Sequence, residues 1–402
     1  MTIVSGLADT ALAAVAVPPT LPVSSNRNSE LSVTLIDSSA SWQACAADWD
    51  ELTLRHPLHG QAWLRSWWEE YGQHQGQLAI LRIDHMGHCV GFAPLFVERT
   101  WKGTALRFLG SGTTCTDYLD IFCRPEWSVR IGQALGKWIA SSSCHSLFGR
   151  IDLIELEGHQ ANAAGVTALQ DALAQSGWTE EIASLESCWV VSFPRTWDEY
   201  LQALSHRGRR RARNAMKNLH SGLMSYHAWH EHDEIVANWQ VFVELHQKRR
   251  HQKGEPGCFA EGHFESFLRR AAFRLAEQGQ ASLVALRLDN KFIAAALQLH
   301  TENRTCLYQT GMDSNYIKLE PGHVINAIML ESCQAKGIGQ FDFLRGNEPY
   351  KARWNAFATP LVRTRLWNPR LTTQVRARMV AMGRCVKQWF STETETRNKE
   401  QE

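Results

Sequence analysis

The stretch FDFLRGNEPYKARW, residues 341–354, decides how the rest of the chain is interpreted. Large apolar residues alternate with a charged one at Phe341, Asp342 and Phe343, as in a short strand that buries one face. The next segment, Asn347-Glu348-Pro349, is a turn that restarts the chain. Polar side chains therefore follow the strand closely, namely Asp342, Arg345, Glu348, Tyr350 and Lys351. This cluster predicts a functional site, and the alternative is a strand end with ordinary ion pairs.

The elements around this stretch repeat one α/β order twice, with a period of about 180 residues. The first unit is predicted to contain a strand at 31–37, helices at 40–55 and 60–72, further strands and helices, and a closing strand at 187–193. The second is predicted to contain helices 233–250 and 260–278, strands 281–288, 291–300 and 304–312, helix 321–336, strand 340–344 and a last strand near 361–367.

This order divides the chain into four parts. Residues 1–29 lack the positive start of a signal peptide and are expected to form a disordered leader. Residues 30–195 and 196–370 are the two predicted domains, and residues 371–402 are a helical and polar tail.

Composition excludes several classes of protein. The chain has 42 basic and 41 acidic residues, which argues against a dedicated DNA-binding protein. Its ten cysteines show neither a C-x-x-C pair nor zinc-ligand spacing, so we expect no metal site and a reducing, cytoplasmic location. The sequence has no stretch of eighteen uncharged apolar residues, so we expect no membrane span.

The last strand of the second unit resembles a known family. Its matching residues are Ala335, Gly337, Asp342-Phe343, Gly346, Tyr350-Lys351 and Trp354. They are similar to the pattern of CelD/BcsL-type proteins of the GNAT acyltransferase superfamily, and the Fem-type aminoacyl transferases have a related strand. The resemblance covers roughly residues 30–367. It implies an α/β fold of tandem GNAT-like units, each a mixed, mostly antiparallel sheet flanked by helices, with a degenerate first unit.

The same resemblance implies a function. It implies transfer of an acyl group from acetyl-CoA or another acyl-CoA to an amine or hydroxyl of a small-molecule or saccharide acceptor, such as a sugar or a cell-envelope or exopolysaccharide precursor. Two alternatives stay open: a Fem-like transferase that uses aminoacyl-tRNA, and a non-catalytic accessory protein of polysaccharide assembly. A tRNA partner is expected only under the first alternative.

Roles for individual residues follow from general acyl-transfer chemistry. Asp342 is predicted to position or deprotonate the acceptor, Tyr350 to donate a proton to the leaving thiolate, and Lys351 to stabilise charge. These three are expected to form one polar group. Arg345 and Glu348 are predicted to bind substrate.

Residues 306–313 and the helix after them are the candidate donor site. A strand, a loop and a helix opened by Pro321 follow one another, and a helix N-terminus can bind phosphate groups. Tyr308, Gly311, Gly322 and His323 are therefore predicted to bind the donor. Ordinary GNAT enzymes carry a glycine-rich loop here, and this chain has only Leu319-Glu320-Pro321-Gly322-His323, which keeps the aminoacyl-carrier alternative open.

Two further segments are candidates for substrate binding. Asp117 and Tyr118 follow a Gly-Ser-Gly loop and resemble the D-Y-x-D pattern of the same family. Residues 204–219 predict a helix on which Arg209 and Arg213 lie off the apolar stripe. We expect these arginines to bind a phosphate-bearing substrate. A solvated basic face and nucleic-acid binding are the alternatives.

Overall fold

The computed structural model describes residues 30–53 and 56–382, and residues from Leu31 onward form one compact unit. The predicted leader, residues 1–29, and the end of the predicted tail lie outside the described residues. Residues 371–382 are helical. Within the described part, every helix is too short or too polar to span a bilayer.

The first half alternates strands and helices in the predicted order. Its elements are β1 (Ser32–Ile36), α1 (Ser39–Ala44), α2 (Ala46–Thr53), α3 (Gln61–Trp67), α4 (Gln73–Gln75), β2 (Gly76–Leu78), β3 (Ile80–His85), β4 (His88–Ala93), β5 (Leu95–Thr100), β6 (Gly103–Phe108), β7 (Phe122–Cys123), α5 (Ser128–Ile139), α6 (Ser142–Phe148), β8 (Leu153–Gln160), α7 (Ala164–Ala174), β9 (Thr179–Ser184) and β10 (Cys188–Ser192). Ser38 accepts a hydrogen bond from Ser41 N–H and so begins α1.

The second half repeats this order after two added helices. Its elements are α8 (Trp197–Ala203), α9 (His206–His220), β11 (Ser225–Trp229), α10 (His232–His251), α11 (Gly262–Glu277), β12 (Ala281–Leu288), β13 (Lys291–His300), β14 (Arg304–Met312), α12 (Pro321–Ala335), β15 (Gln340–Arg345), α13 (Pro349–Ala352), β16 (Phe357–Thr359) and β17 (Leu361–Trp367). A capping box of Thr196 and Glu199 begins α8, and Pro321 occupies the first turn of α12.

The sheets confirm the predicted fold class. One sheet has the strand order β11-β12-β13-β14-β15-β10-β16, and another has the order β2-β5-β6-β8-β17-β9. A four-stranded sheet, β1-β3-β4-β7, belongs to the first half. Each half contains one parallel pair, β6 with β8 and β14 with β15, and the other pairs are antiparallel. The chain is therefore built of two GNAT-like α/β units in tandem.

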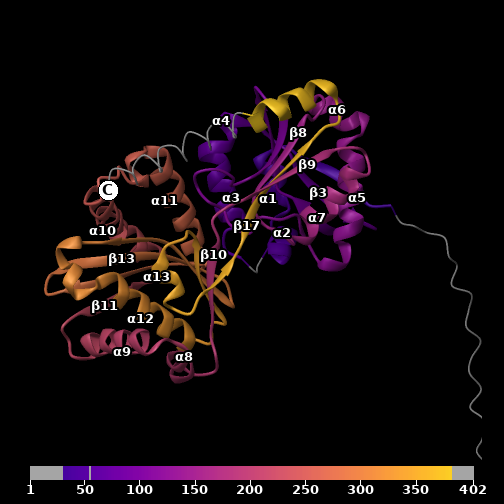
Figure 1. Ribbon diagram of the computed structural model, residues 1–402. Coiled ribbons are helices and arrows are strands. Elements are labelled where there is room, and N and C mark those ends of the chain that lie inside the picture. The colour runs from indigo at the N-terminus through magenta and orange to yellow at the C-terminus, as the bar shows by residue number, and fades with distance from the viewer. Residues whose placement is uncertain (1–29, 54–55, 383–402) are drawn as a thin grey trace, which may run out of the picture. The chain divides into compact units, whose positions relative to one another are not determined.

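The two halves exchange a strand, which the sequence did not predict. β10 follows the first half in sequence but pairs with β15 and β16 of the second. β17 ends the second half but pairs with β8 and β9 of the first (Figure 1). The assignment of residues 187–193 and 361–367 to their own halves was therefore wrong, because a buried apolar strand pattern does not specify which sheet it joins. The domain boundaries at 30–195 and 196–370 stay a prediction.

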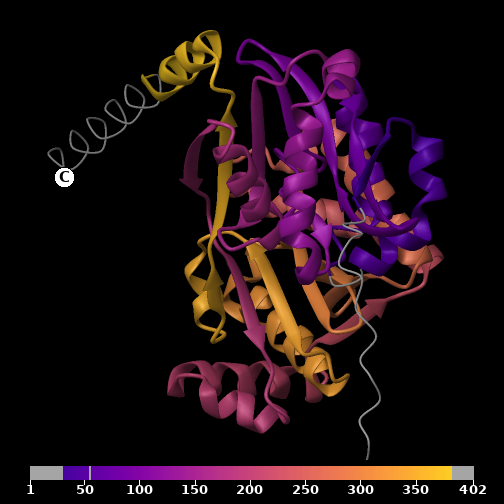
Figure 2. The same cartoon turned by 90° about the vertical axis from the view of Figure 1, so that its right-hand side faces the viewer.

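Apolar packing joins the halves. Trp63 of α3 packs edge-on against Phe267 of α11, with ring centroids 4.9 Å apart, and both rings are fully buried. Burying a ring of this size stabilises the fold by about 1.5–3 kcal/mol. Residues of both halves belong to one hydrophobic core, and Figure 2 shows the indigo and purple elements of the first half beside the orange elements of the second. Four tryptophans, Trp42, Trp49, Trp63 and Trp67, are almost completely buried, so they are core residues.

Candidate functional site

Strands β14 and β15 separate after a short parallel ladder. Their paired residues are Arg304 with Gln340, Thr305 with Phe341, and Cys306 with Asp342. β14 then continues to Met312 and stays paired with β13 on its other side. The backbone of residues 307–312 therefore has no ladder partner from β15 among the described residues. An open strand edge can bind an extended ligand through its N–H and C=O groups.

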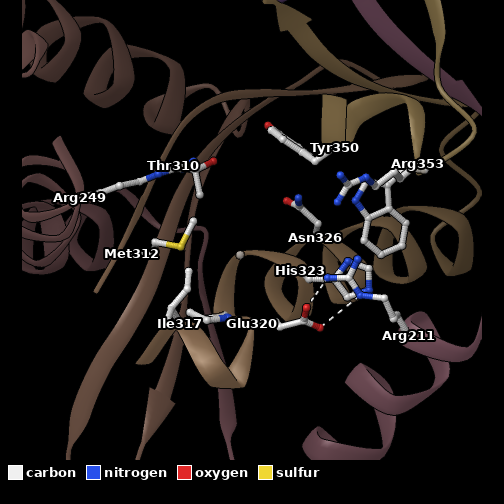
Figure 3. Close-up of a pocket in the computed structure, with 13 residues that line it drawn as sticks. Arg211, Arg249, Thr310, Met312, Ile317, Glu320, His323, Asn326, Tyr350 and Arg353 are labelled. Atoms are coloured by element: carbon white, nitrogen blue, oxygen red, sulfur yellow. Dashed lines mark hydrogen bonds and ion pairs between the residues drawn. The ribbon is translucent and has the colours of Figure 1, made fainter. Parts of the chain in front are cut away.

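A cavity of ≈ 270 Å³ lies at the end of β14. Figure 3 shows Thr310, Tyr350 and Asn326 around its open space, with His323, Glu320 and Arg211 on its other side. Its walls come from α9, α10, β14, the segment that precedes α12, α12 itself, and α13 with the residues after it: Arg211, Arg249, Thr310, Met312, Ile317, Glu320, Pro321, Gly322, His323, Asn326, Tyr350, Arg353 and Trp354.

The first turn of α12 forms one wall of the cavity. Glu320 has a left-handed backbone (φ 50°, ψ 48°), and its carbonyl accepts hydrogen bonds from the N–H groups of His323 and Val324. A Cβ at Gly322 would lie 2.8 Å from Met312 Cε, so glycine lets the helix approach β14 closely. The N-terminus of α12 therefore faces the cavity with its positive dipole end.

Two buried polar atoms in this wall have no hydrogen-bond partner within the described residues. They are Nε2 of His323 and Oδ1 of Asn326, whose side chain is only 7% exposed. An unsatisfied buried polar atom costs about 1–3 kcal/mol, so its retention is typical of a ligand-binding surface. His323 stacks on Trp354 at 4.5 Å, and burial lowers its pKa to about 4, which keeps the imidazole neutral.

Tyr350 and Arg249 supply a proton donor and a positive charge. Burial raises the pKa of Tyr350, so its phenol stays protonated at neutral pH. Arg249 lies in the last turn of α10, and burial lowers its pKa although Tyr350 opposes this. The cavity thus combines an open strand edge, a helix N-terminus, the protonated phenol of Tyr350 and the positive charge of Arg249. These groups can bind a carrier and stabilise an oxyanion.

Asp342, Tyr350 and Lys351 do not form the predicted single polar group. Asp342 is fully buried on the face of β15 that contacts Arg304, with Nη1 3.0 Å from Oδ2. Tyr350 packs on Phe343, which points to the opposite face, with ring centroids 5.9 Å apart. The prediction was wrong because strand alternation turns Asp342 away from the side on which the chain returns.

Asp342 and Lys351 instead fix a strained turn at the end of β15. Leu344 has φ 56°, an uncommon conformation for a leucine. Its N–H donates to Asp342 Oδ1 at 2.8 Å, and its carbonyl accepts from Lys351 Nζ at 3.1 Å. Lys351 also donates to the carbonyls of Arg345 and Gly346 and pairs with Glu348 at 2.9 Å. This turn precedes the segment that carries Tyr350.

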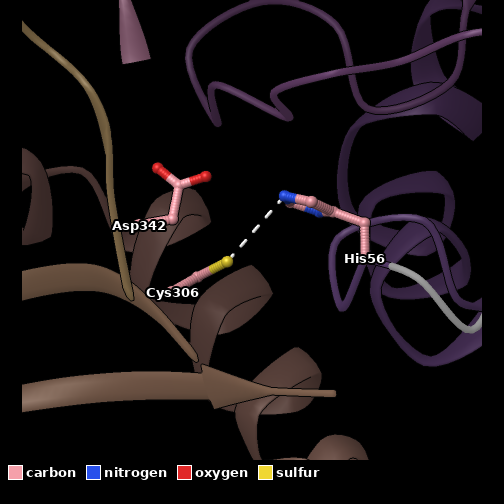
Figure 4. Close-up of side chains that lie close together, drawn as sticks. All are labelled: His56, Cys306 and Asp342. Atoms are coloured by element: carbon pink, nitrogen blue, oxygen red, sulfur yellow. Dashed lines mark hydrogen bonds between the residues drawn. The ribbon is translucent and has the colours of Figure 1, made fainter. Parts of the chain in front are cut away.

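Asp342 also belongs to a group of possible metal ligands with His56 and Cys306. Figure 4 shows these side chains together, and their ligand atoms lie within 4.8 Å of one another. Cys306 Sγ is 3.8 Å from His56 Nε2. Burial raises the pKa of the Cys306 thiol well above 9, and the Arg304 guanidinium already balances the Asp342 carboxylate. The donor set therefore fits a charge-balanced polar core.

The predicted substrate residues Asp117, Tyr118 and Arg345 meet at the junction of the halves. Asp117 Oδ1 accepts from Arg345 Nε at 2.8 Å, and its Oδ2 accepts from the Arg345 backbone N–H. Arg304 lies over the Tyr118 ring at 5.3 Å, and Tyr118 has φ 62°. None of these residues lines the cavity, and Glu348 does not line it either.

The predicted donor residues divide into two pairs. Gly322 and His323 line the cavity. Tyr308 is turned away, because its hydroxyl donates to the Thr114 carbonyl at 2.8 Å. Gly311 allows close packing of β14 on α10, since a Cβ there would lie 2.2 Å from the backbone nitrogen of His246. Tyr308 and Gly311 therefore hold β14 in place and do not line the cavity.

The predicted arginines of α9, Arg209 and Arg213, lie away from the cavity. Arg209 donates to the carbonyls of Leu201 and Gln202 at 3.0 Å and so completes the end of α8. Arg213 is exposed, and neither arginine lines the cavity. Arg211 lines it instead and pairs with Glu320. Arg249, Asn326 and Arg353 also line the cavity and were not among the predicted site residues, although Asn326 is marked by its place in the apolar run of α12.

Comparison with known proteins agrees with this geometry. Residues 206–352 match the model of the acetyltransferase (GNAT) domain. The structure is similar to the crystal structure of FemX, with 12% identity, a TM-score of 0.58, and coverage of 79% of this chain and 95% of that one. It is also similar to a conserved protein of unknown function from Bacteroides thetaiotaomicron VPI-5482, with 13% identity, a TM-score of 0.52, and coverage of 84% and 100%. A search of curated protein sequences finds no match.

Residues 206–352, within the second half, are therefore similar to a GNAT acetyltransferase domain. This domain supports an acyltransferase in general. The similarity to the two solved structures shows the fold, and the CelD/BcsL-type grouping stays a prediction.

Proposed function

We propose that this protein transfers an acyl group from a carrier bound in the cavity at the β14–β15 separation to an amine or hydroxyl. The observation that carries the proposal is the separation itself. The ladder ends at Cys306 and Asp342, and the cavity at the far end of β14 contains Tyr350 and two unpartnered buried polar atoms. Such a gap accepts the extended arm of a carrier between two strands.

The residues of the cavity divide the chemical work. The open edge of residues 307–312 and the N-terminus of α12 bind the carrier and stabilise the negative oxygen of the tetrahedral intermediate. Tyr350 donates its phenolic proton to the leaving group and regains one from the acceptor amine or hydroxyl, which loses its own on acylation. Its raised pKa keeps the phenol protonated at neutral pH before this step. Asn326 and Thr310 orient the acyl group. We assign Asp342 and Lys351 to positioning Tyr350 through the Leu344 turn.

Acyl-CoA is the donor that this domain supports best. One feature keeps aminoacyl-tRNA as a second candidate. A glycine-rich loop would offer several free N–H groups to a pyrophosphate, and here the loop carries the Glu320 carboxylate. The negative Glu320 side chain weakens the binding of a pyrophosphate here unless the side chain moves away.

The acceptor class rests on the resemblance of the last strand to CelD/BcsL-type proteins. A sugar or a cell-envelope or exopolysaccharide precursor is accordingly the proposed acceptor. Asp117, Tyr118 and Arg345 are proposed to shape its approach at the junction of the halves, where Asp117 and Arg345 are held by their mutual ion pair.

The test is thiol release from acetyl-CoA in the presence of amino sugars and saccharides, with acetyl transfer verified by mass spectrometry. Acetyl-CoA at a hundred times its Kd should also stabilise the protein by about 2.7 kcal/mol. Stabilisation by charged tRNA alone would favour the second candidate. An absence of both stabilisation and turnover would favour the non-catalytic accessory role.

A further inference from the structure

We propose that the Glu320 carboxylate is an internal substitute for a phosphate group of the acyl carrier, at an arginine-lined anion site between α9, α12 and α13. The proposal rests on the proposed function, because it assumes that a carrier enters the neighbouring cavity. It adds the place and the chemistry of carrier recognition: the phosphates are held by Arg207 and Arg211 of α9 and by Arg353 after α13, and Glu320 pairs with Arg211 until the carrier arrives.

A second cavity of ≈ 260 Å³ adjoins the first. The two share Arg211, His323, Arg353 and Trp354, so a ligand can extend from one into the other. Among the described residues that line the second cavity, three are arginines and none is acidic: Arg207, Arg211 and Arg353. A carrier whose acyl end lies beside Tyr350 would therefore place its polar end among these guanidinium groups.

The positive charges of this cavity are only partly balanced. Arg207 and Arg353 make no side-chain hydrogen bond or salt bridge within the described part of the chain. Ser205 begins α9 by accepting from the Gly208 N–H at 3.1 Å, so the positive end of a 15-residue helix adds to the same region. Converging cations that lack counter-ions attract an anion, and guanidinium groups bind phosphate with matched geometry.

Glu320 already makes such an interaction. Arg211 Nε lies 3.2 Å from Oε2, and Arg211 Nη2 donates to Oε1, so the pair is bidentate (Figure 3). A phosphate oxygen pair would bind Arg211 in the same way. The Glu320 side chain is 49% exposed, so it can turn into solvent when a phosphate replaces it.

The backbone of Glu320 indicates that this position is constrained. A left-handed conformation (φ 50°, ψ 48°) costs a non-glycine residue about 1–2 kcal/mol. Glycine would relieve this cost, whereas glutamate brings a carboxylate to Arg211. In the free protein the carboxylate neutralises Arg211, and in the complex a phosphate of the carrier would do so.

This competition makes opposite predictions for Glu320 and for an arginine of the proposed anion site. Glu320→Gln removes the competing charge and should tighten CoA binding by about threefold to tenfold. Arg207→Gln should weaken it by about tenfold or more, because a charge-assisted contact to phosphate is lost. Arg207 has no side-chain partner, so its replacement leaves the fold intact; Arg211→Gln is the second variant. Arg213→Gln, on an exposed face of the same helix, is the matched control.

The experiment measures binding by titration calorimetry with CoA, with pantetheine, which lacks the phosphates, and with deacylated tRNA. We expect Glu320→Gln to tighten CoA and to leave pantetheine unchanged, with a steeper salt dependence for CoA. If Glu320→Gln tightened the binding of tRNA but not of CoA, the phosphates bound at this site would be those of RNA. Unchanged or weaker CoA and tRNA binding in Glu320→Gln would overturn the proposal. If that result were accompanied by pantetheine binding and normal acyl transfer, the proposed function would still hold. If the protein neither bound pantetheine nor transferred an acyl group, the proposed function would be contradicted as well.

Discussion

Asp342 and Lys351 hold opposite sides of Leu344 without belonging to one polar group. The Asp342 carboxylate accepts a hydrogen bond from the Leu344 N–H, and the Lys351 ammonium donates one to the Leu344 carbonyl. One residue precedes the strained turn and the other follows it, so together they fix the direction in which the chain leaves β15. That direction brings Tyr350 to the cavity.

Replacing Lys351 should therefore reduce stability. Lys351 is 2% exposed and donates to three carbonyls. Lys351→Met keeps the length of the side chain but leaves these carbonyls without their donor, so we expect a loss of about 2–4 kcal/mol. Urea unfolding measures this loss. Lys253→Met, in an exposed loop, is the control and should change stability little.

Replacing Tyr350 should reduce turnover instead. Tyr350→Phe keeps the ring that packs on Phe343 and removes only the phenolic proton. We expect kcat to fall by about a hundredfold to ten-thousandfold with an unchanged melting temperature. Tyr316→Phe serves as the control, because Tyr316 does not line the cavity. Normal turnover in Tyr350→Phe would show that another group protonates the leaving thiolate.

Much of this fold could be predicted from local sequence patterns. Apolar periodicity located most elements, and Pro321-Gly322 marked the helix start that lines the cavity. The exchange of β10 and β17 could not be predicted, because strand pairing depends on contacts distant in sequence. The face of α9 was also ambiguous. Basic residues occupy positions 206, 207, 209, 210, 211 and 213, so a helical pattern fits several stripes, and only packing selects Arg207 and Arg211.

Asn326 offers a test of whether the cavity retains polar atoms for a ligand. Asn326→Leu keeps the branching and the number of side-chain heavy atoms and removes an unsatisfied buried Oδ1, so the free protein should be equally stable or more stable. The Kd for acetyl-CoA should rise by about tenfold as an orienting hydrogen bond is lost. Thermal unfolding and calorimetry measure the two effects. A lower melting temperature with unchanged affinity would mean that Asn326 has a structural partner.

Buried histidines should make stability depend on pH. Burial lowers the pKa of His59, His246, His300 and His323 to about 4. The unfolded chain, with histidine pKa values near 6.5, binds these protons more readily. The stabilisation is therefore complete above about pH 6.5 and is lost as the pH falls toward 4. Each histidine adds a slope of at most about 1.4 kcal/mol per pH unit.

His300 allows this slope to be measured one group at a time. Burial raises the pKa of Asp120 to about 6, and that carboxyl changes stability with the opposite sign, so the total slope is a sum. Urea unfolding of wild type and His300→Gln between pH 7.5 and 4.5 isolates one histidine. The variant should lose less stability on acidification. Parallel curves for the two proteins would contradict a neutral, buried His300.

The strand exchange predicts which fragments fold. A fragment of residues 196–370 lacks β10, so β15 loses its antiparallel neighbour and β16 loses its only one. A fragment of residues 186–360 contains all seven strands of that sheet. We expect the second fragment to show cooperative unfolding and the first to aggregate, because unpaired strand edges recruit other chains. Both fragments expose the face of α11 that packs on Trp63, so this loss is common to them and cancels in the comparison. Equal stability of the two fragments would mean that β10 contributes little to the second sheet.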